Sequence, residues 1–133
     1  MHKLFSLALV LLTMSAVAQK TTFTHQDSLK GSITPQRAWW DLTHYDLDVA
    51  IDPEKEFISG TNTVTYKVLE PYQTLQIDLQ EPMKLLSAVQ NGKKLEIKKD
   101  GAAYFISLKA KQKKEALNNI LLKFEGKPVV GAR

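Results

Sequence analysis

Short runs of alternating apolar and polar residues, each ended by a turn signal, are the feature that most constrains the fold of this chain. In the first run, Tyr45, Leu47, Val49 and Ile51 alternate with His44, Asp46 and Asp48. Successive side chains of a β-strand point to opposite faces, so a period of two predicts a strand with one buried face. A chain built mainly from such runs folds into sheets.

The same pattern recurs along most of the sequence. Further strands are predicted at about Glu56–Leu69, Leu75–Leu79, Lys84–Gln90, Leu95–Ile97, Tyr104–Leu108 and Ile120–Phe124. The pairs Asn91-Gly92 and Asp100-Gly101 favour tight hairpins. No stretch has the spacing of an amphipathic helix. About seven short strands, with a turn signal roughly every ten residues, predict an all-β domain: an antiparallel β-sandwich or a saddle-like curved sheet.

The first 18 residues have the plan of a secretory signal peptide. A basic start, Met1 to Lys3, leads into an apolar stretch from Leu4 to Leu12 and then into the small residues Ala16 and Ala18. The apolar stretch is about half of the ~20 residues that a helix needs to cross a bilayer. We therefore expect cleavage after Ala18, a secreted or periplasmic location, and a mature chain without a membrane anchor.

The remaining chain divides into a lead-in, one domain and a short end segment. Residues 19–40 are polar, contain Gly31 and Pro35, and have no regular period, which predicts a flexible lead-in. Residues 41–128 are expected to form the β domain, and residues 129–133 have the composition of a loop that begins a truncated connection. The chain has no cysteine, so packing and sheet hydrogen bonds must stabilise an exported domain without disulfides.

The charge of the chain argues against a nucleic-acid function. The net charge of +4 becomes +3 when Lys3 leaves with the signal peptide, and no arginine-rich or aromatic-interleaved stripe accompanies it. The lysines within 93–99 and 109–114 are predicted to lie in solvated turns and at strand edges, where they oppose edge-to-edge aggregation.

The residues of the chain supply no complete catalytic, cofactor-binding or metal site. The histidines of the mature chain are His25 and His44, and neither has the spaced partners that a zinc site needs. Asp46 and Asp48 share a strand face but lack the further oxygens and the glycine turn of a calcium loop, so a solvated outer face is favoured. No nucleophile elbow and no phosphate-binding glycine loop is present.

Trp39-Trp40 and Gly60 have two interpretations each. Paired tryptophans can form a stacking platform for sugars, but strand neighbours point to opposite faces, so burial against the sheet or a partner domain is favoured. Gly60 lies on the apolar face of the second strand. A glycine there more often marks a bulge or a close backbone approach than a ligand site.

Three stretches between Asp41 and Gly131 resemble the N-terminal β domain of the M1 family (gluzincin) of zinc aminopeptidases, of the secreted Bacteroidetes type. They are His44–Asp48 with Ile51–Glu54, Phe57–Val64 with its diagnostic Gly60, and Leu75–Leu79 with Leu122–Pro128. The chain departs from the family at Lys113–Ala116, where a glycine turn is expected, and at Phe124, where the family has tyrosine.

The resemblance implies a saddle-shaped domain that precedes a thermolysin-like zinc domain and covers part of its active-site cleft. In the family, two histidines and a distant glutamate bind zinc and another glutamate acts as general base; no residue of this chain corresponds to them. The resemblance therefore implies a non-catalytic fragment, inactive alone, whose partners are the catalytic domain and, in the full enzyme, peptide substrates. The alternative is a free-standing secreted β-sandwich module that binds carbohydrate or protein through Trp39, Trp40 or a strand edge.

Overall fold

The computed structural model describes residues 22–129, in which antiparallel strands form most of the structure. The elements are α2 (His25–Gly31), α3 (Pro35–Ala38), β1 (Trp40–Asp52), β2 (Phe57–Val68), β3 (Thr74–Asp78), β4 (Lys84–Gln90), β5 (Lys93–Lys94), β6 (Glu96–Asp100), β7 (Ala103–Ser107) and β8 (Leu117–Gly126). The predicted signal peptide, residues 1–18, lies outside the described residues, as do residues 130–133.

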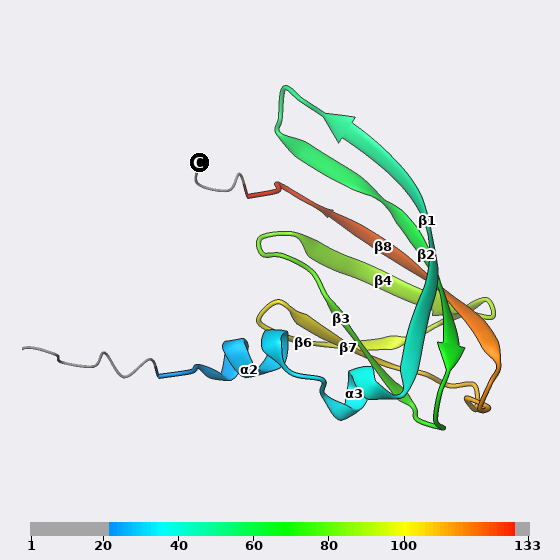
Figure 1. The fold of residues 1–133 in the computed structure, drawn as a ribbon. Helices are drawn as coiled ribbons and strands as arrows, with labels where there is room; N and C mark the ends of the chain where they lie inside the picture. The colour runs from blue at the N-terminus through cyan, green and yellow to red at the C-terminus, as the bar shows by residue number, and fades with distance from the viewer. Residues whose placement is uncertain (1–21, 130–133) are drawn as a thin grey trace, which may run out of the picture.

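The strands form two antiparallel sheets that face each other. Sheet A has five strands in the order β1-β2-β8-β4-β5, and sheet B has three in the order β3-β7-β6. Figure 1 shows both sheets curving, with the β1–β2 hairpin extending beyond sheet B. The prediction of an all-β antiparallel sandwich is confirmed.

The hydrophobic core lies between the two sheets. Val64, Tyr66 and Val68 of β2 are fully buried, as the alternation of that strand predicted. They meet Leu75 of β3 and Ile106 of β7 from the opposite sheet. The second strand therefore has the buried face that its period of two indicates.

A buried polar network crosses one side of this core. The Tyr66 hydroxyl donates to Gln112 Oε1 at 2.8 Å and accepts from Gln90 Nε2 at 2.9 Å. Both glutamines are buried, at 1% and 5% exposure. Burial raises the pKa of the Tyr66 phenol, because removal from water disfavours the phenolate.

The hairpin predicted at Asn91-Gly92 forms, but its return strand divides between the sheets. Asn91 and Gly92 both have positive φ, 52° and 72°, as a tight hairpin turn requires. Lys93–Lys94 pairs with β4 in sheet A, whereas Glu96–Asp100 pairs with β7 in sheet B. Leu95 makes the crossing with its side chain buried, so one residue joins the two sheets at this end.

The described part of the lead-in holds two short helices, where the sequence analysis expected no regular structure. Thr24 caps α2 in a reciprocal capping box with Asp27, and Pro35 starts α3. Gln26 Nε2 donates to Asp100 Oδ1 at 3.0 Å. No residue of α2 is buried. Helices stabilised by caps and long-range polar contacts leave no apolar period in the sequence, which is why the pattern did not indicate them.

Strand β1 forms as predicted, but the prediction that its apolar face is buried is wrong for the described chain. Tyr45, Leu47, Val49 and Ile51 are 48%, 56%, 41% and 71% exposed. β1 is the edge strand of sheet A, and it curves away from sheet B (Figure 1). A period of two identifies the apolar face of a strand, but it does not establish that another element covers that face.

Candidate functional site

The residues considered as metal ligands do not come together. Among residues 22–129, no group of three or more histidine, aspartate or glutamate side chains is arranged to hold a metal ion. His25 Nε2 lies 2.7 Å from Asp100 Oδ2 at the end of β6, whereas His44 belongs to β1. Asp46 and Asp48 are exposed. The described residues therefore do not fit a zinc site of the three- or four-ligand kind.

The two tryptophans pack in and against the interior, and they do not form an exposed platform on which a sugar could stack. Trp39 is 3% exposed and its indole N–H donates to the Thr74 carbonyl at 2.8 Å. Trp40 is half-buried and donates to the Gln36 carbonyl at 3.0 Å. Both rings pack edge-to-face on Tyr66, with centroids 5.8 and 5.9 Å away. Trp39 precedes β1, so strand alternation does not separate the two rings.

The concave side of sheet A presents a continuous apolar surface, which we call the open apolar face. Cross-strand neighbours define its rows: Leu47 pairs with Asn62 and Asn62 with Leu122, while Val49 pairs with Gly60 and Gly60 with Phe124. The face consists of Tyr45, Leu47, Val49 and Ile51 of β1, Gly60 and Asn62 of β2 and Phe124 of β8, and it continues into the buried Val64 and Leu122 at the edge of the core. Asn62 supplies the one amide of this face, and Tyr45 supplies a hydroxyl.

Gly60 allows β1 and β2 to approach closely within this face. A Cβ atom at Gly60 would lie 2.2 Å from the Asp48 carbonyl oxygen, a backbone atom that cannot move aside without displacing β1. The predicted close backbone approach is confirmed. The glycine that is diagnostic in the sequence therefore has a steric role in the register of the hairpin.

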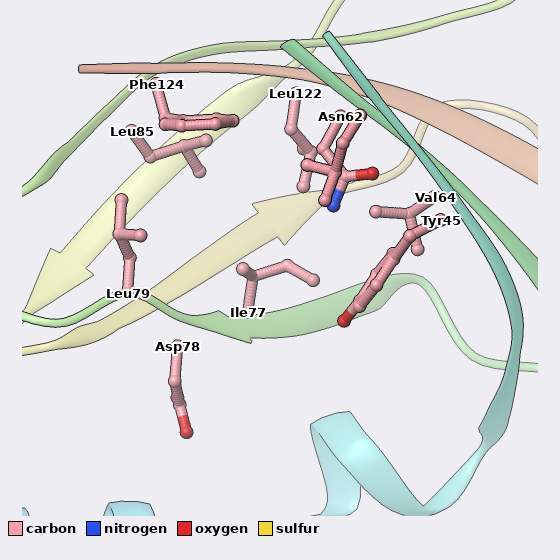
Figure 2. A pocket seen from close by; sticks show the side chains of 10 residues that line it. Tyr45, Asn62, Val64, Ile77, Asp78, Leu79, Leu85, Leu122 and Phe124 are labelled. Carbon is pink, nitrogen blue, oxygen red and sulfur yellow. The ribbon is translucent and has the colours of Figure 1, made fainter. Parts of the chain in front are cut away.

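A groove of about 230 Å³ lies between the open apolar face and β3. Its lining is almost entirely apolar: Tyr45, Leu47, Asn62, Val64, Ile77, Asp78, Leu79, Leu85, Leu122 and Phe124. Figure 2 shows the Asn62 amide among the apolar side chains, whereas the Asp78 carboxylate points away from them. That carboxylate is bound by Arg37 and accepts from Gln76 Nε2 at 3.0 Å. The other polar groups of the lining are the Asn62 amide and the Tyr45 hydroxyl.

The Asn62 Oδ1 atom is buried and has no hydrogen-bond partner among residues 22–129. An unsatisfied buried acceptor costs about 1–3 kcal/mol, so such groups are rare in stable interiors. The sequence analysis did not single out Asn62. A signal was present, because Asn62 is the polar member of the series Ile58, Gly60, Asn62, Val64 that otherwise forms the apolar face of β2.

The fold and this face together define a class: an all-β antiparallel sandwich with one apolar surface uncovered. No family model and no curated protein matches the sequence. Solved structures of M1 zinc metallopeptidases do match the fold. The Deinococcus radiodurans enzyme bound to a Tyr-Ser-Ala substrate gives a TM-score of 0.63 at 21% identity, over 73% of this chain and 22% of that chain.

Two further solved structures of M1 zinc metallopeptidases also match the fold of this chain. The Deinococcus radiodurans M1 zinc metallopeptidase gives a TM-score of 0.62 at 22% identity, over 69% of this chain and 21% of that chain. A two-domain M1 zinc metallopeptidase bound to L-arginine gives 0.62 at 23% identity, over 74% and 22%. The chain spans about a fifth of the length of these structures. Its fold is therefore that of one part of an M1 zinc metallopeptidase.

Within residues 22–129, no helix is long and apolar enough to span a membrane.

Proposed function

We propose that this chain is the N-terminal, non-catalytic domain of an exported, zinc-dependent M1 aminopeptidase of the secreted Bacteroidetes type. In this proposal it packs on the catalytic domain and shapes the peptide-substrate cleft. The fold shared with two-domain M1 metallopeptidases supports the relationship. The signal-peptide pattern of residues 1–18 supports export.

The open apolar face is the observation that carries the proposal. Leu47, Val49 and Ile51 are each at least 41% exposed on one strand, next to an apolar groove. Full burial of such a side chain is worth roughly 1.5–3 kcal/mol, so covering this face stabilises an assembly. Contiguous apolar surface on a soluble domain usually marks a contact with another protein. A catalytic domain of the same polypeptide is the partner that the shared fold favours.

The side chains of this chain indicate which role it has and which role belongs to the catalytic domain. The described residues do not fit a zinc site, so the metal and the hydrolytic chemistry belong to the catalytic domain. Residues of this chain contribute a rigid sheet and an apolar contact surface. The alternative, a module that stacks carbohydrate on Trp39 and Trp40, has no exposed tryptophan pair with which to work.

The coding sequence that adjoins the codon for Arg133 tests this proposal. We expect it to continue in frame into a domain with an HExxH helix and a glutamate further along, which are the zinc ligands and general base of the family. The expressed chain Met1–Arg133 alone should have no aminopeptidase activity. A stop codon after Arg133 with no such sequence in any downstream frame, or chelator-sensitive peptidase activity of the chain alone, would contradict the proposal.

A further inference from the structure

We propose that one end of the sandwich, which we call the lysine end, binds the surface of a bilayer that contains anionic phospholipids. The lysine end consists of the turn at residues 90–94 and the links at residues 69–73 and 108–117. This inference goes beyond the proposed function and does not depend on it, because it concerns a different surface from the open apolar face. Four properties of the lysine end support it.

The fold brings together two lysine runs that are separate in the sequence. Lys109 Nζ donates to the Lys94 carbonyl at 3.0 Å, and Lys93 and Lys109 line the same hollow. A third segment joins them, because Gln73 Nε2 donates to the Ala110 carbonyl at 3.3 Å. One surface therefore carries six exposed lysines: Lys93, Lys94, Lys109, Lys111, Lys113 and Lys114.

Most of this positive charge is not neutralised within the chain. Five of the six lysines form no ion pair among residues 22–129: Lys93, Lys94, Lys109, Lys111 and Lys113. Protection of a sheet edge accounts for Lys93 and Lys94, which form the edge strand β5. It does not account for the other three, because residues 109–113 belong to no strand. A lysine close to an anionic bilayer strengthens binding about five-fold.

The opposite end of the molecule is acidic. Glu115 N–H of the lysine end donates to the carbonyl of Val68, the last residue of β2, whereas the β1–β2 turn precedes the first residue of that strand. Figure 1 shows the tip of this hairpin far from the β4–β5 turn and from the link between β7 and β8. The hairpin carries five carboxylates: Asp46, Asp48, Asp52, Glu54 and Glu56. An anionic surface attracts the lysine end and repels the hairpin, so it holds the molecule in one orientation.

Exposed apolar side chains beside the lysines favour a lipid surface over other polyanions. Leu117 is 66% exposed and follows the lysine-rich link directly, and Leu69 and Tyr72 are each 37% exposed. The ion pair between Lys114 and Glu70 places these segments side by side. Peripheral binding to a bilayer combines attraction to anionic lipids with burial of apolar side chains among the head groups. Binding to a nucleic acid depends mainly on its phosphates and needs no aliphatic side chain.

Two small hollows between the lysines fit lipid head groups. Lys93 and Lys109 flank a hollow of about 100 Å³, and Lys111 and Lys113 flank a second one of about 230 Å³. Asn91 lines both. Both are smaller than the roughly 300–1,000 Å³ of pockets for drug-sized ligands, so each accommodates one small group. Lysine binds phosphate as a point charge, and a phospholipid head group presents a phosphate.

A fluorescent dye placed at either end of the molecule tests the proposed orientation. The chain has no cysteine, so Leu117→Cys labels the lysine end uniquely, and Ile51→Cys labels the hairpin at a side chain that is 71% exposed. Each full-length variant carries a nitrobenzoxadiazole dye and is mixed with vesicles of phosphatidylcholine, either pure or with an equal part of phosphatidylglycerol. We expect the dye at position 117 to gain fluorescence with the anionic vesicles only, and the dye at position 51 to stay unchanged.

The two labelled chains are matched in every other respect. Residues 1–18 are present in both, so binding of that apolar segment to lipid does not produce a difference between the two positions. No gain at position 117, or an equal gain at both positions, would overturn the proposal.

Substitution of lysines separates a defined surface from the effect of net charge. One variant neutralises three unpaired lysines of the lysine end: Lys93→Gln, Lys111→Gln and Lys113→Gln. The control neutralises three exposed lysines elsewhere: Lys84→Gln, Lys123→Gln and Lys127→Gln. Titration of the dye at position 117 with anionic vesicles should show about a hundred-fold weaker binding for the first variant, from five-fold for each lysine, and less than a five-fold change for the control. Both variants should keep the unfolding midpoint of the parent chain, and equal losses of binding would contradict the proposal.

Competition with DNA separates a lipid surface from a nucleic-acid surface. An excess of duplex DNA at physiological salt should leave the chain bound to the anionic vesicles, because the apolar side chains of the lysine end contact lipid only. Displacement of the chain by DNA would show that the lysine end is a nucleic-acid surface and that the lipid proposal is wrong.

Discussion

At the scale of single residues, Gly60 and Asn62 are neighbours on the same face of β2 with opposite effects on the chain. Gly60 removes a side chain where β1 passes too closely for a Cβ atom. Asn62 inserts an amide where the surrounding side chains are apolar. The first stabilises the hairpin that bears the open apolar face, whereas the second costs stability in the uncovered chain.

Replacing Gly60 by alanine should destabilise the domain. Its Cβ would lie 2.2 Å from the Asp48 carbonyl oxygen, and forcing an added methyl group into a packed site typically costs about 1–3 kcal/mol. We expect a lower urea midpoint for Gly60→Ala. Gly31→Ala is the control, because no atom lies within 4 Å of its added Cβ, and its midpoint should not fall. Equal midpoints for the two variants would show that β1 shifts without cost.

The sequence predicts some of these residues better than others. Gly60 was identified because a glycine within a strand has few common explanations. Asn62 was missed because the consequence of one polar residue in a strand depends on what lies above it. Gln90 and Gln112 were missed for a related reason. Their burial depends on the Tyr66 hydroxyl, which lies 24 and 46 positions away along the chain.

At the scale of elements, α2 is held by a cap that is sensitive to acid. Hydrogen bonds from the Thr24 side chain and backbone hold the pKa of Asp27 below its ordinary value. A carboxyl group with a lowered folded-state pKa stabilises the fold above its unfolded-state pKa, and that contribution is lost as pH falls through the folded-state pKa. The capping contribution to α2 should therefore begin to decline below about pH 4, the ordinary pKa of an aspartate, and be lost as pH falls through the lower folded-state pKa.

The measurement is the set of Cα chemical shifts of residues 25–31. We expect their helical values to decline as pH falls from 5 to 2, and Asp27→Asn to show reduced helical values already at pH 7. Asp46→Asn removes a carboxylate from exposed β1, and its α2 shifts should match those of the unmodified chain at every pH. Helical shifts in Asp27→Asn that equal those of the unmodified chain at pH 7 would show that the Asp27 carboxylate contributes nothing to α2.

Strand positions were largely predictable because alternation is a local property of the sequence. The bounds of β4 agree with those predicted, and those of β2 agree to within one residue at each end. The division of the return strand at Leu95 was not predictable, since both of its parts have strand character and only the partners differ. Glu115 has a positive φ of 67°, which explains why the turn at Lys113–Ala116 is a place where glycine is expected.

At the scale of the whole molecule, the sandwich class followed from the sequence, but the uncovered surface did not. Pattern analysis assumes that an apolar strand face meets a covering layer within the same chain. In the described residues, sheet B covers the part of sheet A around Val64 and Tyr66, and the β1 face remains open. The pattern of one chain does not contain the information on what covers that face.

The open apolar face should dominate the solution behaviour of the isolated chain. We expect strong fluorescence of an apolar dye such as ANS. The triple variant Leu47→Thr, Val49→Thr, Ile51→Thr should lose most of that signal with little loss of stability, because these side chains are already exposed. Asp46→Thr with Asp48→Thr changes the opposite face of the same strand and serves as the control. Dye fluorescence that is unchanged in the triple variant would show that this face does not bind apolar molecules.

The crossing at Leu95 has a mechanical consequence. Leu95 ties sheet A to sheet B at one end of β4, because Lys93–Lys94 pairs with β4 and Glu96–Asp100 pairs with β7. At the other end of β4, residues 79–83 also connect the two sheets, since they join β3 to β4 beside Leu79 and Leu85 of the groove. Strand β4 is therefore anchored to sheet B at both ends, and the groove should keep its width when another element covers it.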